Sequence, residues 1–171
     1  MNMKSSLRTK AKDIRKNLNL EKISEQILKK IKQHKFYQNA ENIMIFYPTK
    51  YEINLLNLLN DKKKFYLPKV NGKDLLVCPY KKGEYLEKSS FNIFEPCSNP
   101  EKPGILDLVI IPALMADKNG YRLGYGGGFY DRFLPTLKPE CKTITVVPLE
   151  LLTDNLPHEN FDIKTDLIIT N

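Results

Sequence analysis

The sequence predicts an α/β fold, a single-domain three-layer α/β/α sandwich around a mostly parallel, mixed and Rossmann-like sheet. Short apolar runs alternate with amphipathic helical patterns, which is the order expected of a sheet covered by helices. The apolar runs are nearly continuous, which is typical of strands buried on both faces. A chain of 171 residues with 42% apolar residues is long enough to form one core, so we expect one domain over residues 1–171.

Two helices are predicted at the N-terminus, over residues 4–18 and 20–34. In the first, apolar residues recur at intervals of 4, 3 and 4 and form one stripe, made of Leu7, Ala11, Ile14 and Leu18. A basic stripe lies beside it, made of Lys4, Arg8, Lys12 and Arg15. The simplest interpretation of such a row is a solvated face. Asn19 is the expected N-cap of the second helix.

The next segments predict a strand, a loop and a short helix. Residues 42–47 form an apolar run that Pro48 stops, so we expect a buried strand there. Residues 48–52 follow as a loop. The leucine-rich residues 53–60 then predict a short helix.

A hairpin is predicted around Asn71-Gly72, a strong turn signal. Its first strand covers residues 64–67 and is expected to end at Pro68, and its return strand covers residues 75–80. The proline-rich residues 81–104 predict a long irregular surface segment with anchored apolar side chains at Phe91, Ile93 and Phe94.

Residues 106–114 are the most apolar run and predict the central strand. A turn over residues 117–120 and a helix ending near Leu137 flank the glycine-rich stretch described next. Two further strands are predicted toward the C-terminus, with a loop-like segment over residues 149–164 between them. These strands cover residues 143–147 and 166–170.

Residues 120–132 hold five of the eight glycines and two of the four arginines. Free backbone N–H groups before a helix form a cradle for anions, and the guanidinium groups of Arg122 and Arg132 can donate to phosphate oxygens. In open α/β sheets, ligands bind beyond the carboxyl ends of the strands, where this stretch is expected. It therefore predicts a phosphate-binding loop. A structural turn and contact with another small ligand are the alternatives.

The glycine pattern matches neither of the two common nucleotide motifs. It lacks the Gly-Lys-Ser/Thr ending of a Walker A loop, and Phe129 stands where a dinucleotide fingerprint needs its third glycine. Glycine costs about 0.5–1 kcal/mol against alanine in regular structure, so three in a row favour a close approach to a ligand.

Three side chains of this stretch have two interpretations each. Asp131 in the first helical turn either complements the helix dipole or binds Mg²⁺. Tyr125, among glycines, can stack on a planar ring, whereas Tyr130 is expected to pack inward with Phe133 and Leu134.

Composition excludes several classes of site. Three widely spaced cysteines and two histidines make neither a disulfide framework nor a zinc motif, and no nucleophile triad is indicated. No apolar run approaches the roughly 18 residues of a membrane span, and the N-terminus lacks a signal-peptide core, so we expect a cytoplasmic protein. The net charge of +7 fits either a soluble surface or an anionic ligand.

Residues 121–132 closely resemble the signature of the 5-formyltetrahydrofolate cyclo-ligase (methenyltetrahydrofolate synthetase) family. Further segments fall in the family's order, namely residues 4–8, 65–68, 91–96, 107–112 and 166–170. The resemblance implies an ATP-dependent ligase of one-carbon metabolism that uses Mg²⁺. It would convert 5-formyltetrahydrofolate to 5,10-methenyltetrahydrofolate, ADP and phosphate.

The resemblance also implies a role for individual residues. Lys4 and Arg8 would contact ATP, and Asp131 would serve the metal and, with Arg122, catalysis. The loop around the ATP phosphates would comprise Arg122, Leu123, Gly124, Tyr125, Gly126, Gly127, Gly128, Phe129 and Tyr130. The folate would contact Tyr47, Glu52, Tyr125, Gly126, Gly127, Gly128 and Phe129. Residues 49–51 depart from the family's small residues before the glutamate, and His158 receives no role.

Two other functions remain to be separated from this one. A different α/β enzyme could bind a phosphosugar or a CoA ester at the same loop. A nucleic-acid-binding module ranks last, because the basic first helix has no aromatic residues to interleave with its charges. We therefore expect small-molecule substrates, reduced folate and ATP, with no nucleic-acid or membrane partner, and a monomer.

Overall fold

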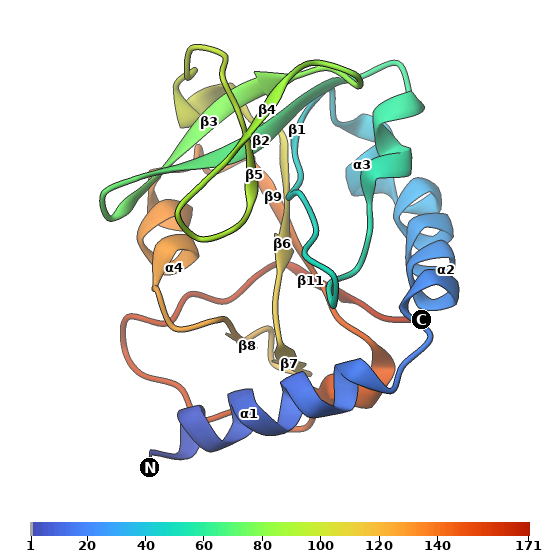
Figure 1. The fold of residues 1–171 in the computed structure, drawn as a ribbon, viewed down its shortest axis with the longest axis vertical. Coiled ribbons are helices and arrows are strands. Elements are labelled where there is room, and N and C mark those ends of the chain that lie inside the picture. The colour runs from blue at the N-terminus through green and yellow to red at the C-terminus, as the bar shows by residue number, and fades with distance from the viewer. Residues whose placement is uncertain (1) are drawn as a thin grey trace.

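A six-stranded sheet forms the middle layer of the structure, a computed structural model that describes residues 2–171 (Figure 1). The only antiparallel neighbours in this sheet are β2 and β3; its other pairs are parallel. The predicted mixed, mostly parallel sheet is thus confirmed, with β6 in its interior. The spatial order is β11 (Leu167–Ile169), β9 (Lys142–Val146), β6 (Leu108–Pro112), β1 (Asn42–Met44), β2 (Lys64–Asn71) and β3 (Asp74–Tyr80).

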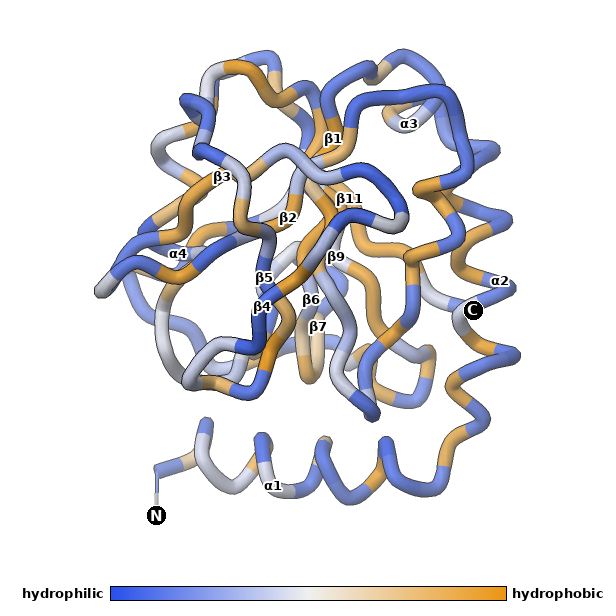
Figure 2. The backbone as a smooth tube through the Cα atoms, turned by 45° about the horizontal axis from the view of Figure 1, so that its top comes forward, coloured by the Kyte–Doolittle hydropathy of each residue, from blue (hydrophilic) through white to orange (hydrophobic). Residues whose placement is uncertain are grey.

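Helices cover both faces of the sheet, because successive strand residues point to opposite sides. Ile43 faces a core shared with α2 (Leu20–Gln33) and α3 (Lys35–Asn39). Its neighbour Met44 faces a second core, which includes residues of α4 (Phe129–Phe133) and the 3₁₀ turn η3 (Leu134–Thr136). The three predicted layers are therefore present. Figure 2 shows that hydrophobic residues are concentrated in the strands of the middle layer.

Helix α1 (Met3–Lys16) lies across the carboxyl ends of the parallel strands and covers neither face (Figure 1). Asn2 caps it, since its side chain accepts from the Ser5 N–H at 2.8 Å. Ala11 packs there against Leu114 and Leu151. The helix therefore closes the end of the sheet at which ligands bind in α/β folds.

A small three-stranded sheet lies just past β6 and leads the chain to the glycine stretch. Its order is β10 (Leu152–Thr153), β7 (Met115–Asp117) and β8 (Arg122–Leu123), and the 3₁₀ turn η4 (Leu149–Leu151) precedes β10. The prediction of one strand over residues 106–114 was wrong at its end, because β6 stops at Pro112 and the chain turns into this second sheet.

Two other boundaries differ from the prediction. Strand β2 continues through Pro68 to Asn71, because β1 pairs with β2 only as far as Tyr66 and a missing N–H is tolerated past that point. The helix predicted over 53–60 is a 3₁₀ turn, η1 (Leu56–Asn60). The hairpin is confirmed, with Asn71 opposite Asp74.

Residues 81–104, predicted to be irregular, contain an antiparallel pair and a 3₁₀ turn. These are β4 (Leu86–Lys88), β5 (Phe94–Pro96) and η2 (Pro103–Ile105). The Val70 N–H donates to Glu95 at 2.7 Å, which fastens β5 to the end of β2. Within residues 2–171, no helix combines the length and the hydropathy that a bilayer crossing requires.

Candidate active site

The glycine loop, residues 124–128, runs from β8 to α4 and is open to solvent in its middle. Gly126 and Gly128 have φ angles of +107° and +69°, a region that side chains disfavour. At Gly127 a Cβ atom would lie 2.7 Å from the Phe129 ring. No backbone carbonyl within residues 2–171 accepts a hydrogen bond from the N–H groups of these three glycines. The loop therefore presents backbone donors that an anion can use.

Helix α1 brings two cations to this loop. Arg8 Nε donates to Gly124 O at 2.8 Å, and its guanidinium lies beside Gly126. Lys4, one turn earlier, lies 2.6 Å from Asp162 and 3.3 Å from Glu159. Burial alone would lower the pKa of Lys4, but hydrogen bonds to these two carboxylates raise it. Arg8 thus adjoins the loop directly, whereas Lys4 contacts the 159–162 segment, whose Asp162 lies near Arg122.

Arg122 and Asp131 form an ion pair of 2.8 Å at the start of α4. Arg122 also donates to Ile163 O at 2.7 Å, and the Ile163 N–H donates to Asp131 Oδ1 at 3.1 Å. The Arg122 side chain is 5% exposed and that of Asp131 is 26% exposed, so solvent screens the pair only in part. Both contacts of Asp131 use Oδ1, which leaves Oδ2 to meet a cation.

Asp162 is a second carboxylate near Arg122, and sequence analysis gave it no role. Burial alone would raise its pKa, but hydrogen bonds from Lys4 and from the Glu159 N–H lower it, and the charge of Arg122 acts in the same direction. Residues 2–171 contain no cluster of three His, Cys, Asp or Glu side chains that could hold a metal ion. One or two carboxylates fit Mg²⁺, which keeps several waters and binds mainly through substrate phosphates.

Glu52 lies close to Tyr125 of the glycine loop. It is 9% exposed and accepts from the Thr49 N–H at 2.9 Å. Burial of the hydroxyl end, together with the Glu52 carboxylate, raises the pKa of Tyr125, although about half of that residue, 49%, is exposed. The same two causes raise the pKa of Tyr130. The structure therefore brings Glu52 together with two tyrosines of the glycine stretch.

The segment between β4 and β5 adds aromatic side chains to this region. Phe91 makes an edge contact with Phe129, with ring centroids 5.9 Å apart, and Phe94 makes one with Tyr47 at 5.2 Å. Phe91 is 56% exposed, so a broad aromatic surface stays open beside the loop. In the sequence, this surface was indicated only by large aromatic residues in an otherwise polar segment, and we interpreted those residues as anchors of the segment to the core.

Arg15 was predicted to lie on a solvated face, and this prediction was wrong. The residue is 2% exposed, and its guanidinium donates to Tyr51 O at 2.9 Å and to carbonyls at the end of β6. The cause is the position of α1, whose inward face carries residues 4, 8, 11 and 15. Lys12 is exposed, as predicted.

Three other side chains in or beside the glycine stretch pack against the protein itself. Leu123 is buried in the core, so only its backbone can face a ligand. Arg132 donates to Gly127 O at 2.8 Å and to Lys73 O at 2.9 Å, so it braces the outer side of the loop. His158 stacks on Tyr121 with centroids 3.8 Å apart.

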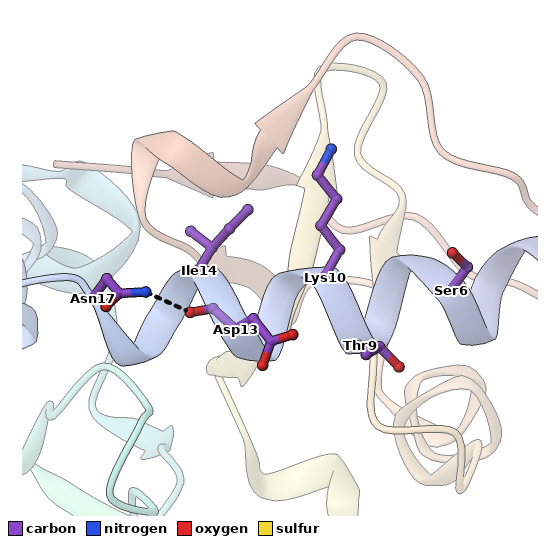
Figure 3. Close-up of a pocket in the computed structure, with 6 residues that line it drawn as sticks. All are labelled: Ser6, Thr9, Lys10, Asp13, Ile14 and Asn17. Carbon is purple, nitrogen blue, oxygen red and sulfur yellow. Dashed lines mark hydrogen bonds between the residues drawn. The ribbon is translucent and has the colours of Figure 1, made fainter.

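A separate hollow of about 520 Å³ runs along the outward face of α1 (Figure 3). Its lining residues belong to this helix or, for Asn17, to its C-cap, and none was predicted to bind a ligand. They are Ser6, Thr9, Lys10, Asp13, Ile14 and Asn17. Because Lys4 and Arg8 project from the opposite face, this hollow is not the candidate active site.

Comparison with known proteins gives consistent matches over the full chain. A family model described as the 5-formyltetrahydrofolate cyclo-ligase family matches residues 1–171. The Haemophilus influenzae 5-formyltetrahydrofolate cyclo-ligase is 28% identical, with 94% of this chain and 93% of that protein covered. The mouse protein of the same name is 28% identical, with 97% and 92% covered. The NMR structure of Aquifex aeolicus 5,10-methenyltetrahydrofolate synthetase superposes with a TM-score of 0.84 at 28% identity, covering 98% of this chain and 89% of that one.

Proposed function

Because this chain belongs to the 5-formyltetrahydrofolate cyclo-ligase family, we propose that it converts 5-formyltetrahydrofolate and ATP to 5,10-methenyltetrahydrofolate, ADP and phosphate. One observation carries the proposal beyond family membership. The glycine stretch contains the Arg122–Asp131 ion pair and meets Arg8, and its Tyr125 and Phe129 lie beside Glu52 and Phe91. Such a loop can hold a nucleotide and a planar folate against each other.

The reaction needs activation of the formyl oxygen, because an amide oxygen is a poor leaving group. That oxygen attacks the γ-phosphorus of ATP, a new P–O bond forms, and the bond to ADP breaks. N10 then attacks the formyl carbon and closes the ring, N10 loses its proton, and phosphate leaves with the former formyl oxygen. No protein nucleophile is required, so the protein's task is positioning and charge stabilisation.

On the nucleotide side, the free N–H groups of the loop would meet the phosphate oxygens, together with Lys4, Arg8 and Arg122. Hydrogen bonds to charged groups contribute about 1.5–3 kcal/mol each. Donors fixed in advance stabilise the charge that develops as the γ-phosphoryl group moves. Arg122 is held on two sides in the structure, which fits a group that must keep one orientation.

Asp131 would hold Mg²⁺, and Asp162, a second carboxylate near Arg122, directly precedes Ile163, whose N–H donates to Asp131. When bound, the ion would neutralise part of the phosphate charge. A cation on Asp131 Oδ2 would leave the Oδ1 bonds to Arg122 and to the Ile163 N–H in place, so Arg122 would keep its orientation toward the nucleotide.

On the folate side, Glu52 offers a largely buried carboxylate to the donor groups of the pterin. Tyr47, Tyr125 and Phe129 would contact the rings, and the exposed edge of Phe91 extends the same aromatic surface. The alternative substrates, a phosphosugar or a CoA ester, give no reason for this combination of rings and a carboxylate. A single domain, a monomeric state and a cytoplasmic location stay predictions.

The test of this function follows the near-ultraviolet absorbance of the methenyl product after the protein is mixed with 5-formyltetrahydrofolate and Mg-ATP. We expect a rise that needs ATP and is absent with ADP. No ATP-dependent rise would contradict the proposed function.

A matched pair of variants on α1 tests the nucleotide side. Arg8→Ala should raise the KM for ATP by about ten-fold or more, because a charge-assisted contact to the loop and phosphates is lost. Lys12→Ala, one turn along the helix and exposed, should leave this KM unchanged. Equal effects of the two variants would remove Arg8 from the nucleotide site.

A further inference from the structure

Arg15 joins three segments that are far apart in the sequence. It projects from α1, donates to Tyr51 O in the loop after β1, and donates to Ala113 O and Leu114 O at the end of β6. Tyr51 directly precedes Glu52. The guanidinium therefore fixes the backbone that carries the Glu52 side chain.

The groups that surround Arg15 also belong to the proposed folate side of the site. The residue is 2% exposed, and the ionisable groups beside it are Tyr125 and Glu52. Burial lowers the pKa of Arg15, and these two groups act in the opposite direction. Its buried Nε has no hydrogen-bond partner within residues 2–171. Since buried donors are nearly always paired, the fold alone does not complete the bonding of this group.

We propose that Arg15 is a positioning residue of the folate site, which holds the turn at Tyr51 against the end of β6 so that Glu52 stands beside Tyr125. This proposal rests on the proposed function, because it takes Glu52 as a folate contact. Arg15 acts through Glu52, and its planar guanidinium suits it to bridge several carbonyls in one plane.

The geometry of α1 separates this role from simple support of the helix. Lys4 and Arg8, the expected nucleotide contacts, lie on its N-terminal half, and Arg15 lies near its end. If α1 as a whole were displaced, nucleotide and folate binding would both weaken. If only the turn at Tyr51 moved, folate binding alone would weaken.

The experiment compares the Michaelis constants of Arg15→Met and Arg15→Lys for both substrates, with folate binding by calorimetry in the absence of nucleotide. Arg15→Met should raise the KM for 5-formyltetrahydrofolate by about ten-fold or more while that for ATP changes by less than about two-fold, because misplaced binding groups lose contacts selectively. Arg15→Lys should fall between this variant and the wild type, since an ammonium group cannot bridge the same carbonyls in one plane. If Arg15→Met does not fold, the lysine variant gives the same comparison.

Ile14→Ala is the control, because Ile14 packs in the same small core under α1 but makes none of the Arg15 contacts. Equal rises of both Michaelis constants in the Arg15 variants would overturn the proposal. A selective rise of the folate KM in Ile14→Ala, at the same loss of Tm as in the Arg15 variants, would also overturn it. Wild-type Michaelis constants in Arg15→Met would do the same. An inactive wild-type enzyme would instead contradict the proposed function. An unchanged folate KM in Glu52→Gln would remove the folate contact on which the proposal depends.

Discussion

Single residues of the glycine loop require glycine for two different reasons. Gly126 and Gly128 have positive φ angles, whereas Gly127 has no room for a Cβ atom beside Phe129. At Gly126 the space itself is adequate, since the nearest atom to a Cβ would be Arg8 Cζ at 3.6 Å. Backbone conformation is therefore the only constraint at that position.

We expect Gly126→Ala to raise the KM for ATP by about ten-fold, because a side chain in this conformation costs about 1–2 kcal/mol and the loop relaxes away from its donor geometry. The measurement is steady-state kinetics with varied ATP. Gly104→Ala is the control, since Gly104 has no positive φ and open space around it. An unchanged KM in Gly126→Ala would mean that the loop conformation is not needed for the nucleotide.

The sequence predicted much of this neighbourhood but not all of its members. Several residues that the sequence assigned to the site do lie together, as the contacts of Arg8 with Gly124 and of Arg122 with Asp131 show. Their roles in binding stay predictions. The burial of Arg15 could not be predicted, because the two stripes are neighbours on the first helix and only the packing of α1 decides that its buried face takes a residue from each, Ala11 and Arg15.

Among the elements, the amino ends of β1 and β6 are tied together by Asp107, which directly precedes β6. Its carboxylate accepts from the Glu41 N–H, from the Asn42 N–H and from Lys138, at 3.1, 2.8 and 2.9 Å. Burial alone would raise the pKa of Asp107, but these bonds lower it from 3.8 to about 2. This end of the sheet is opposite the glycine loop.

We expect Asp107→Asn to lower the free energy of unfolding at pH 7 by about 1–2 kcal/mol. The full pKa shift corresponds to a somewhat larger free energy, but the carboxylate is partly exposed and solvent screens its interactions. A depressed pKa stabilises the fold above the unfolded value, so the difference from wild type should shrink as the pH falls from about 4 toward 2. Urea unfolding across this range measures it. The kcat at pH 7 should stay unchanged, and a difference that grows in acid would refute the account.

In the proposed function, the β4–β5 pair would form a wall of the folate site, because its connecting segment brings Phe91 against Phe129. We expect Phe91→Ala to raise the KM for 5-formyltetrahydrofolate by about two- to ten-fold, as aromatic pairs contribute about 0.5–1.5 kcal/mol. Tyr85→Ala is the control, since Tyr85 is 75% exposed and precedes β4. If both variants bind folate as the wild type does, the segment is not part of the site.

Strand positions were easier to predict than their ends. Apolar runs located the strands of the central sheet, and Asn71-Gly72 located the hairpin. The ends depend on neighbours that local sequence does not reveal, as β2 shows by continuing through Pro68 where β1 no longer pairs with it. The β4–β5 pair lacks a period-two pattern, so its three-residue strands were missed.

At the scale of the whole molecule, the first helix, the end of the sheet and the C-terminal segment meet around one loop. Ligands that bind there should stabilise the entire fold, because they bind only the folded chain. We expect saturating Mg-ATP at about 100 times its Kd to add about 2.7 kcal/mol to the free energy of unfolding, seen as a rise in Tm. Arg122→Ala should abolish most of this rise, and an equal rise in that variant would argue against nucleotide binding at the loop.

The ion pairs beside the glycine loop also determine how the site responds to salt. Lys4 is matched by Asp162 and Arg122 by Asp131, so two of the three cations on the nucleotide side are neutralised, and within residues 2–171 only Arg8 of the three has no carboxylate partner. In the proposed function, the phosphates of a magnesium nucleotide would meet these cations while its divalent ion meets the neighbouring carboxylates, so the opposite charges of ligand and site would be matched locally. Binding of the magnesium nucleotide should therefore weaken only slightly as ionic strength rises, unlike capture by unpaired cations, which depends on long-range attraction that salt screens.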